Sequence, residues 1–330
     1  MESAIVAVGR AITTASGSQA AERLASSLFQ CCETFANSRW QSVAWRFSGL
    51  TADGSPLEFT FSSAGNALRY TVDVAVPEVP NHQRIGAACK LAARLGHPRP
   101  DEDTLQRWSV MQQDHALRWG ARLGVRETGN QESVKYYLEI PFEAQRTIQC
   151  WISPPQRSSI AVMMGYTPQS GTTEYYFRQH QLSQEQLPCL LGMLASDEER
   201  DAMVQGIEHV CAMPLASALR WICFGYSIAV GAGKTSIPSI ALFVRTGAIG
   251  GAARARQRLL QWMHPSAKER SFYCQLVAGL PEAELPDHGV FSLSFLGNAR
   301  VELSVNLSGV ALARLLQSRP SVMADRVRAS

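Results

Sequence analysis

The most chemically informative stretch of this chain runs from Val134 to Pro141 and reads Val-Lys-Tyr-Tyr-Leu-Glu-Ile-Pro. Alternate side chains of a β-strand share one face, so Lys135, Tyr137 and Glu139 are expected to point together. An ammonium group can bind an anion, an aromatic ring can stabilise a cation, and a carboxylate can accept a proton. We interpret this segment as a strand whose inner side lines a polar cavity.

Three further predicted strands carry polar side chains on one face in the same way. The groups that share a face are Arg69, Thr71 and Asp73; Glu174, Tyr176 and Arg178; and Arg300, Glu302, Ser304 and Asn306. For a single strand, a solvated outer face is the commoner explanation. Helices predicted between the hairpins would cover the outer faces, so these polar faces are expected to point inward.

The elements that must position these residues are antiparallel hairpins separated by helices. Helices are expected at 17–38, 84–95, 103–115, 183–194, 197–211, 252–263 and 310–317, and strands at 43–48, 57–62, 67–76, 117–125, 133–140, 147–152, 160–166, 172–178, 221–230, 236–245, 271–277, 290–296 and 300–307. Hairpins do not suit a parallel βαβ sheet, whereas a closed barrel leaves no strand edge exposed. The predicted fold class is α/β (α+β), with about ten antiparallel strands in a barrel surrounded by helices.

The domain prediction follows from this order of elements. Residues 1–40 are expected to form a helical segment that packs on the barrel, 41–318 the barrel domain, and 319–330 a frayed tail. A barrel of ten strands is too wide for its own side chains to fill, so it would enclose a ligand chamber.

Composition excludes several classes of function. Hydrophobic residues make up 46% of the 330 residues and charged residues 18%, with a formal net charge of +3. That charge is too small to predict nucleic-acid binding, and the longest apolar runs fall far short of the ~20 residues of a membrane helix. Eight cysteines without a CxxC pair indicate buried thiols and a reducing, cytoplasmic setting. We expect a cytoplasmic monomer without nucleic-acid or membrane partners.

Familiar catalytic motifs are missing from the sequence. The glycines of Gly231-Ala-Gly-Lys-Thr-Ser236 resemble a phosphate loop, but position 228 is Ile and a strand rather than a helix follows. A hairpin turn explains them. The seven histidines show no HExxH pattern, and no Gly-x-Ser-x-Gly sequence occurs. These absences count against hydrolase and zinc-enzyme functions.

The strands at 68–77, 134–141 and 174–178, with the hairpin-then-helix order, resemble the soluble aromatic prenyltransferases of the ABBA, or PT-barrel, fold. The likeness in element order spans roughly residues 40–310. It implies an enzyme with a ten-stranded barrel of repeated αββα units. Such an enzyme transfers a dimethylallyl or geranyl group from its diphosphate to an electron-rich indole or phenol by Friedel–Crafts-like alkylation.

The resemblance also implies roles for individual residues. Lys135 matches the lysine that binds the diphosphate, and Arg300 falls near a basic residue of the last hairpin that meets it as well. Arg69 and Arg178 are expected to bind the diphosphate as well. Tyr137 and Tyr176 match the aromatic residues that shield the allyl cation.

Proton transfer and metal binding are assigned more loosely. Glu139 and Glu174 are the candidate proton acceptors, although either could instead pair with Lys135 or Arg178. Glu174 stands where the family pattern has asparagine. No cofactor is expected to be required, with Mg²⁺ held through Asp73 as the alternative.

Two departures from the family pattern keep other functions open. The strand at 236–244 lacks an arginine near Ser239 or Ile240, and the preceding strand lacks a tyrosine near Ala229. The first alternative is a non-catalytic barrel that binds a hydrophobic ligand or a partner protein. The second is an interaction protein built on two α+β sandwiches.

Overall fold

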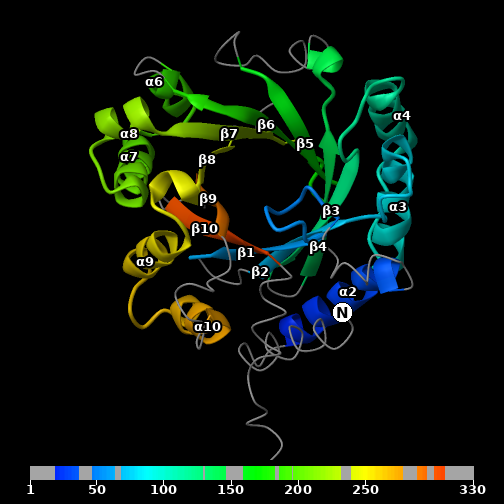
Figure 1. Ribbon diagram of the computed structural model, residues 1–330, viewed down its shortest axis with the longest axis horizontal. Coiled ribbons are helices and arrows are strands. Elements are labelled where there is room, and N and C mark those ends of the chain that lie inside the picture. Colours follow the sequence, from blue (N-terminus) through cyan, green and yellow to red (C-terminus); the bar gives the residue numbers. More distant parts are fainter. Residues whose placement is uncertain are drawn as a thin grey trace, which may run out of the picture.

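The computed structural model describes residues 19–36, 47–63, 68–128, 131–145, 159–182, 186–194, 196–231, 239–277, 288–295 and 301–308. Ten antiparallel strands form a closed barrel in the order β1-β10-β9-β8-β7-β6-β5-β4-β3-β2 (Figure 1). The strands are β1 Leu57–Ser62, β2 Leu68–Asp73, β3 Ala121–Thr128, β4 Gln131–Glu139, β5 Ala161–Thr167, β6 Thr172–Gln181, β7 Cys223–Val230, β8 Ser239–Arg245, β9 His288–Phe295 and β10 Val301–Ser308. The barrel predicted from the sequence is confirmed.

Each strand pairs with its sequence neighbour, and the pairing of β1 with β10 closes the ring. In that last pair, Thr60 lies opposite Asn306 and Ser62 opposite Ser304. Closure leaves no unpaired strand edge, which is why a sheet this large needs no edge protection.

Helices surround the barrel on the outside, as Figure 1 shows. They are α2 Gln19–Ala36, α3 Arg84–Arg94, α4 Glu102–Gln112, α6 Gln186–Leu191, α7 Asp197–Cys211, α8 Leu215–Trp221, α9 Ala252–Trp262 and α10 Lys268–Val277, with 3-10 turns η2 Asn81–Gln83, η3 Phe142–Ala144 and η4 Thr246–Ile249. Asp101 caps α4, because its side chain accepts a hydrogen bond from the Thr104 amide at 2.7 Å. Ser196 caps α7 in the same way.

The hydrophobic core lies between the outer face of the barrel and the helices. Along β4 the outward side chains Val134, Tyr136 and Leu138 are buried. The Trp108 ring of α4 packs against the Tyr136 ring, with centroids 5.8 Å apart. Since the outer faces are used for packing, the alternate residues of the strands point into the barrel. Polar side chains therefore gather inside.

Two sequence predictions need correction. Residues 271–277, predicted as a strand, belong to helix α10, because the closed barrel offers no edge for another strand. Short apolar runs do not by themselves distinguish strand from helix. Arg270 donates hydrogen bonds to the carbonyls of Leu260 at 2.6 Å and Met263 at 3.3 Å, which holds α10 against α9. Helix α8 was not predicted at all.

Other predictions lie outside the described residues. These are the strand at 147–152, the helix at 310–317, the tail at 319–330 and almost all of the strand at 43–48. Cys31, Cys32, Cys89 and Cys211 are buried thiols, whereas Cys189 and Cys223 are exposed. Among the helices that the structure describes, none is long and apolar enough to cross a membrane.

Candidate functional site

The inner faces of the strands enclose a chamber of about 390 Å³. Its wall carries cations, carboxylates, hydroxyls and aromatic rings. The lining residues that matter below are Arg69, Thr71, Arg126, Lys135, Tyr137, Glu174, Tyr176, Phe243, Phe295 and Glu302. The polar cavity inferred from alternation in β4 is therefore present, and Lys135 and Tyr137 face it.

Lys135 lies at the centre of a polar cluster on β4, β6 and β7. Its Nζ donates to the Glu174 carboxylate and, at 2.9 Å, to the Tyr176 hydroxyl. Tyr176 donates to the same carboxylate at 2.8 Å, and Ser227 of β7 also donates to it. Three donors thus satisfy Glu174, and Lys135 forms an ion pair in the chamber wall.

Aromatic rings surround this ion pair. The Tyr137 and Tyr176 rings have centroids 6.0 Å apart, and the Phe243 ring lies 5.7 Å beyond Tyr176. Lys135 Nζ is 5.5 Å from the Tyr137 centroid and 5.3 Å from that of Tyr176. These rings already contact one cation, at distances where cation–π attraction operates.

Two glycines leave the space that the Lys135 and Tyr137 side chains occupy. Gly165 of β5 lies between β4 and β6, and a Cβ there would overlap Lys135 Cε and come within 3.3 Å of Nζ. A Cβ on Gly124 of β3 would lie 2.7 Å from Cε2 of the Tyr137 ring. Lys135 therefore reaches Glu174 by crossing a strand position that has no side chain.

The protonation states follow from these contacts. Burial alone would raise the pKa of Glu174, but the Lys135 charge and the hydrogen bonds from Lys135, Ser227 and Tyr176 outweigh it and lower the pKa. Burial and the Glu174 charge raise the pKa of Tyr176 well above its usual value. At neutral pH the cluster holds a carboxylate, an ammonium and a neutral phenol.

A second charged cluster joins β2, β3 and β10. Arg69 Nη2 lies 2.9 Å from Glu302 Oε1, and the Ser62 hydroxyl donates to the same oxygen. Arg126 lies opposite Arg69 in the β2–β3 register and is exposed to solvent in the chamber. Partial burial and the Arg69 charge lower the pKa of Arg126. Arg126 was missed at the sequence level, although alternation in 117–125 extended by one residue places it on the inner face.

Glu58 is a further inward residue that sequence reasoning missed. It lies opposite Thr71, which lines the chamber, and accepts a hydrogen bond from Asn306 Nδ2 at 2.9 Å. Burial raises the pKa of Glu58 to about 8, although the Arg122 charge opposes this shift. Alternation in Leu57–Ser62 was the available signal, because it places Glu58 on the same face as Thr60.

Glu139, predicted as a proton acceptor, has a different environment. Its carboxylate is buried and accepts hydrogen bonds from the backbone amides of Arg118, Trp119 and Gly120 at 2.7 to 3.1 Å. It is not among the residues that line the chamber. These contacts fix the loop before β3.

Replacing Glu139 with Gln should therefore destabilise the protein without removing its chemistry. The amide would set an N–H group against backbone donors, at a cost of about 1–3 kcal/mol. We expect a lower melting temperature and a near-normal turnover per folded molecule, measured by thermal unfolding and activity on one preparation. A large fall in turnover with an unchanged melting temperature would return Glu139 to the catalytic candidates.

The structure does not place the remaining predicted site residues on the wall of the chamber. Asp73 Oδ1 accepts from Arg122 Nε at 2.9 Å, and the Arg122 guanidinium lies 4.5 Å from the Trp119 ring. Arg178 is exposed and does not line the chamber. Arg300 lies outside the described residues. Within the described part of the chain, no group of three His, Cys, Asp or Glu side chains is placed to hold a metal ion.

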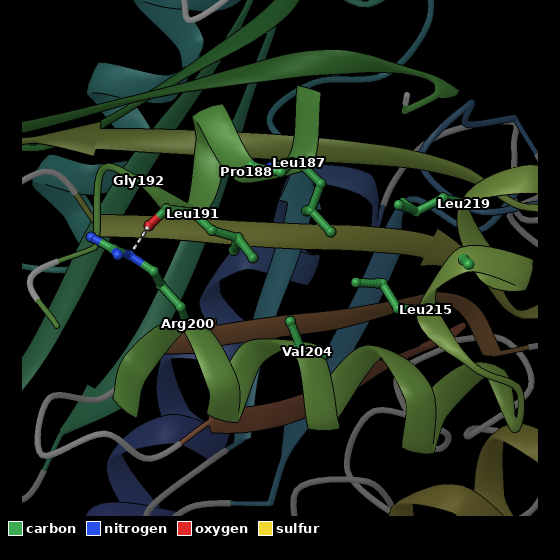
Figure 2. Close-up of a pocket in the computed structure, with 9 residues that line it drawn as sticks. Leu187, Pro188, Leu191, Gly192, Arg200, Val204, Leu215 and Leu219 are labelled. Carbon is green, nitrogen blue, oxygen red and sulfur yellow. Dashed lines mark hydrogen bonds between the residues drawn. The ribbon is translucent and has the colours of Figure 1, made fainter. Parts of the chain in front are cut away.

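A second cavity lies outside the barrel, between α6, α7 and α8 (Figure 2). At about 570 Å³ it is larger than the chamber, but leucine side chains dominate its wall. Its one cation, Arg200, donates to the Leu191 carbonyl at 3.3 Å and pairs with Asp197. The barrel chamber therefore carries the residues that can do chemistry.

A ten-stranded antiparallel barrel with a polar interior and an outer ring of helices defines the PT-barrel class of fold. No protein-family model matches the chain, and no curated protein matches it by sequence. Solved structures do match it closely in fold.

Two of these structures are dimethylallyltryptophan synthases by name, and a third is AnaPT. 5-dimethylallyltryptophan synthase from Streptomyces coelicolor is 14% identical, with a TM-score of 0.73 over 94% of this chain and 98% of that one. 6-dimethylallyltryptophan synthase from Micromonospora olivasterospora is 13% identical, with a TM-score of 0.62 over 90% and 99%. AnaPT from Neosartorya fischeri is 12% identical, with a TM-score of 0.65 over 92% of each chain. The chain shares their fold, as the resemblance predicted.

Proposed function

We propose that this protein is an aromatic prenyltransferase that moves a dimethylallyl or geranyl group from its diphosphate to an indole or phenol. The observation that carries the proposal is the placement of Lys135 between the Tyr137 and Tyr176 rings on the wall of a closed chamber. Support comes from the fold, which is that of a Streptomyces coelicolor enzyme solved in complex with DMASPP and Trp.

In the proposed reaction, Lys135, Arg69 and Arg126 bind the donor's diphosphate. As the bond between the allylic carbon and oxygen breaks, these cations stabilise the charge that develops on the leaving diphosphate. The allyl cation that remains is held against the Tyr137 and Tyr176 rings. Phe243 and Phe295 close part of the remaining wall.

The acceptor then supplies the electron pair for the new carbon–carbon bond. An aromatic carbon attacks the allyl cation, and the resulting arenium ion loses a proton to restore aromaticity. We assign Glu58 as the proton acceptor, since it shares the inner face of β1 with Thr60, lies opposite Thr71, and has a pKa of about 8; Thr60 and Thr71 both line the chamber. Glu139 and the Asp73–Arg122 pair hold the strands that carry the site.

Metal ions are not assigned a necessary role in this proposal. The chamber's own cations face the diphosphate, and Asp73 is engaged with Arg122. We propose that Mg²⁺ at most assists binding of the donor, and that the protein acts as a cytoplasmic monomer. Turnover that persists after dialysis against EDTA would support this view, and turnover restored only by added Mg²⁺ would contradict it.

A non-catalytic barrel that binds a hydrophobic ligand is the second candidate. The specific observation in its favour is that Glu174 and Glu302 neutralise Lys135 and Arg69 inside the chamber. In addition, Ser239 lines the chamber where the family pattern has arginine.

Product formation separates the two candidates. The purified chain is incubated with dimethylallyl or geranyl diphosphate and a pool of indoles and phenols, and the pool is analysed by mass spectrometry. An acceptor that gains a five- or ten-carbon unit supports the enzyme. No product from any acceptor, with binding of the donor intact, supports the ligand-binding barrel.

A further inference from the structure

The Lys135 ammonium group lines the chamber and forms an ion pair with a carboxylate of the protein itself. Glu174 contacts it directly, and the hydrogen bonds from Ser227 and Tyr176 orient the carboxylate. A phosphate oxygen that approached Lys135 would meet the Glu174 oxygens at the same place. Like charges at this distance repel each other, and the low pKa of Glu174 keeps its charge at neutral pH.

The ion pair is a consequence of the strand sequence. Gly165 lies between Lys135 and Glu174 and leaves the space that the Lys135 side chain crosses. Glu174 is opposite Gly165 in the β5–β6 register. Three strands therefore contribute to one internal salt bridge that faces the cavity.

The ion pairs neutralise most of the positive charge on the chamber wall. Its lining contains three cations, Arg69, Arg126 and Lys135, and two carboxylates, Glu174 and Glu302. Arg69 pairs with Glu302 and Lys135 with Glu174. Of these three lining cations, Arg126 makes no ion pair within the described part of the chain. The lining thus has a net charge of about +1, whereas a diphosphate monoester carries up to three negative charges.

We propose that Glu174 is an internal competitor for Lys135, and that it sets how strongly the chamber binds phosphate groups of high charge. This inference rests on the proposed function, in which Lys135 binds the donor's diphosphate. Glu174 then acts as a specificity-determining residue: a diphosphate must displace its carboxylate from Lys135, whereas an anion of lower charge can bind at Arg126 alone.

Removing the charge of Glu174 should tighten binding of diphosphate. Glu174→Gln keeps the size of the side chain and leaves it able to hydrogen-bond Ser227, but it releases the Lys135 ammonium. Isothermal titration with inorganic diphosphate and inorganic phosphate, on the full chain at one pH and ionic strength, measures the effect. We expect diphosphate affinity to rise about 10- to 100-fold, because a close like charge is removed. The gain for phosphate should be smaller.

Two further variants isolate the cause. Glu132→Gln is the matched control, since Glu132 pairs with His97 and does not line the chamber. It should bind diphosphate as the unmodified chain does. The double variant Lys135→Ala/Glu174→Gln should lose the gain. If Glu174→Gln fails to fold, Glu174→Asn repeats the test with a shorter neutral side chain.

The outcomes distinguish this inference from the proposed function. A folded Glu174→Gln variant that binds diphosphate no more tightly, in a protein that transfers prenyl groups, would overturn the competitor role alone. Absence of diphosphate binding in both the unmodified chain and the variant would overturn the donor site as well. A gain that survives in the double variant would show that Lys135 is not the group in competition.

Discussion

We expect Lys135→Ala to lower the proposed prenyl transfer by about 100- to 1000-fold, the range seen when one preorganised donor to a developing negative charge is removed. Lys135 is the one lining cation that also contacts both tyrosine rings of the chamber. Its loss would remove a positive charge from the proposed diphosphate site and the ammonium group that contacts the two tyrosine rings. The measurement is steady-state turnover with dimethylallyl diphosphate and the best acceptor.

A control variant must separate a loss of catalytic turnover from a loss of protein stability. Lys135→Ala leaves the partly buried Glu174 carboxylate without its cation, and breaking even a fully buried ion pair costs about 3–5 kcal/mol. Lys135→Ala/Glu174→Gln removes that penalty and should show the same loss of turnover with a higher melting temperature. Lys90→Ala, on the exposed face of α3, should change neither the turnover nor the melting temperature. Normal turnover in a folded Lys135→Ala variant would remove Lys135 from the site.

Glu58→Gln is expected to have the second large effect, because glutamine cannot accept the proton of the arenium ion. General base catalysis contributes about 100- to 10,000-fold in rate, so turnover should fall within that range. The pKa of about 8 predicts that the rate of transfer by the unmodified protein rises with pH up to about 8 and then levels. The variant should lose this rise. A pH profile of kcat/KM on both proteins makes the comparison.

Thermal unfolding provides an independent check on Glu58. Its pKa is about 8 in the folded protein against 4.5 as the reference value, so the folded state binds the proton more tightly than the unfolded chain. This contribution to stability is present below pH 4.5 and is lost as pH rises to about 8. Glu58→Gln should therefore flatten the fall in melting temperature between pH 5 and 8, roughly the same window. Glu102→Gln, an exposed residue of α4, should leave it unchanged. An unaltered fall in Glu58→Gln would contradict the raised pKa.

The order of hairpins and helices was enough to predict the barrel, and strand alternation was enough to predict the inner placement of Lys135 and Tyr137. The physical reason is that the period of a strand is two, so one polar face cannot be buried against the helices without exposing the apolar face. The same reasoning reached Glu174 and Tyr176. It stopped short of Glu58 and Arg126, because the inner faces of their strands carry only one or two charged residues and look like ordinary solvated faces.

Strand alternation predicts which face a side chain is on, but not which group it contacts. Glu139 has the inward parity of β4, yet the backbone amides of the loop before β3 bind its carboxylate. The ion pair between Lys135 and Glu174 depends on the register of three strands and on the space left at Gly165. Helix α10 was misassigned because seven residues of mixed polarity do not reveal that the barrel is already closed.

A crystal structure with the unreactive donor analogue dimethylallyl thiolodiphosphate would show whether the barrel chamber binds the donor at Lys135. We expect the diphosphate to contact Lys135, Arg69 and Arg126, Glu174 to have moved away from Lys135, and the allyl group to lie between the Tyr137 and Tyr176 rings. Analogue bound in the apolar cavity between α6, α7 and α8, with the Lys135–Glu174 pair intact and the barrel chamber unfilled, would contradict this expectation.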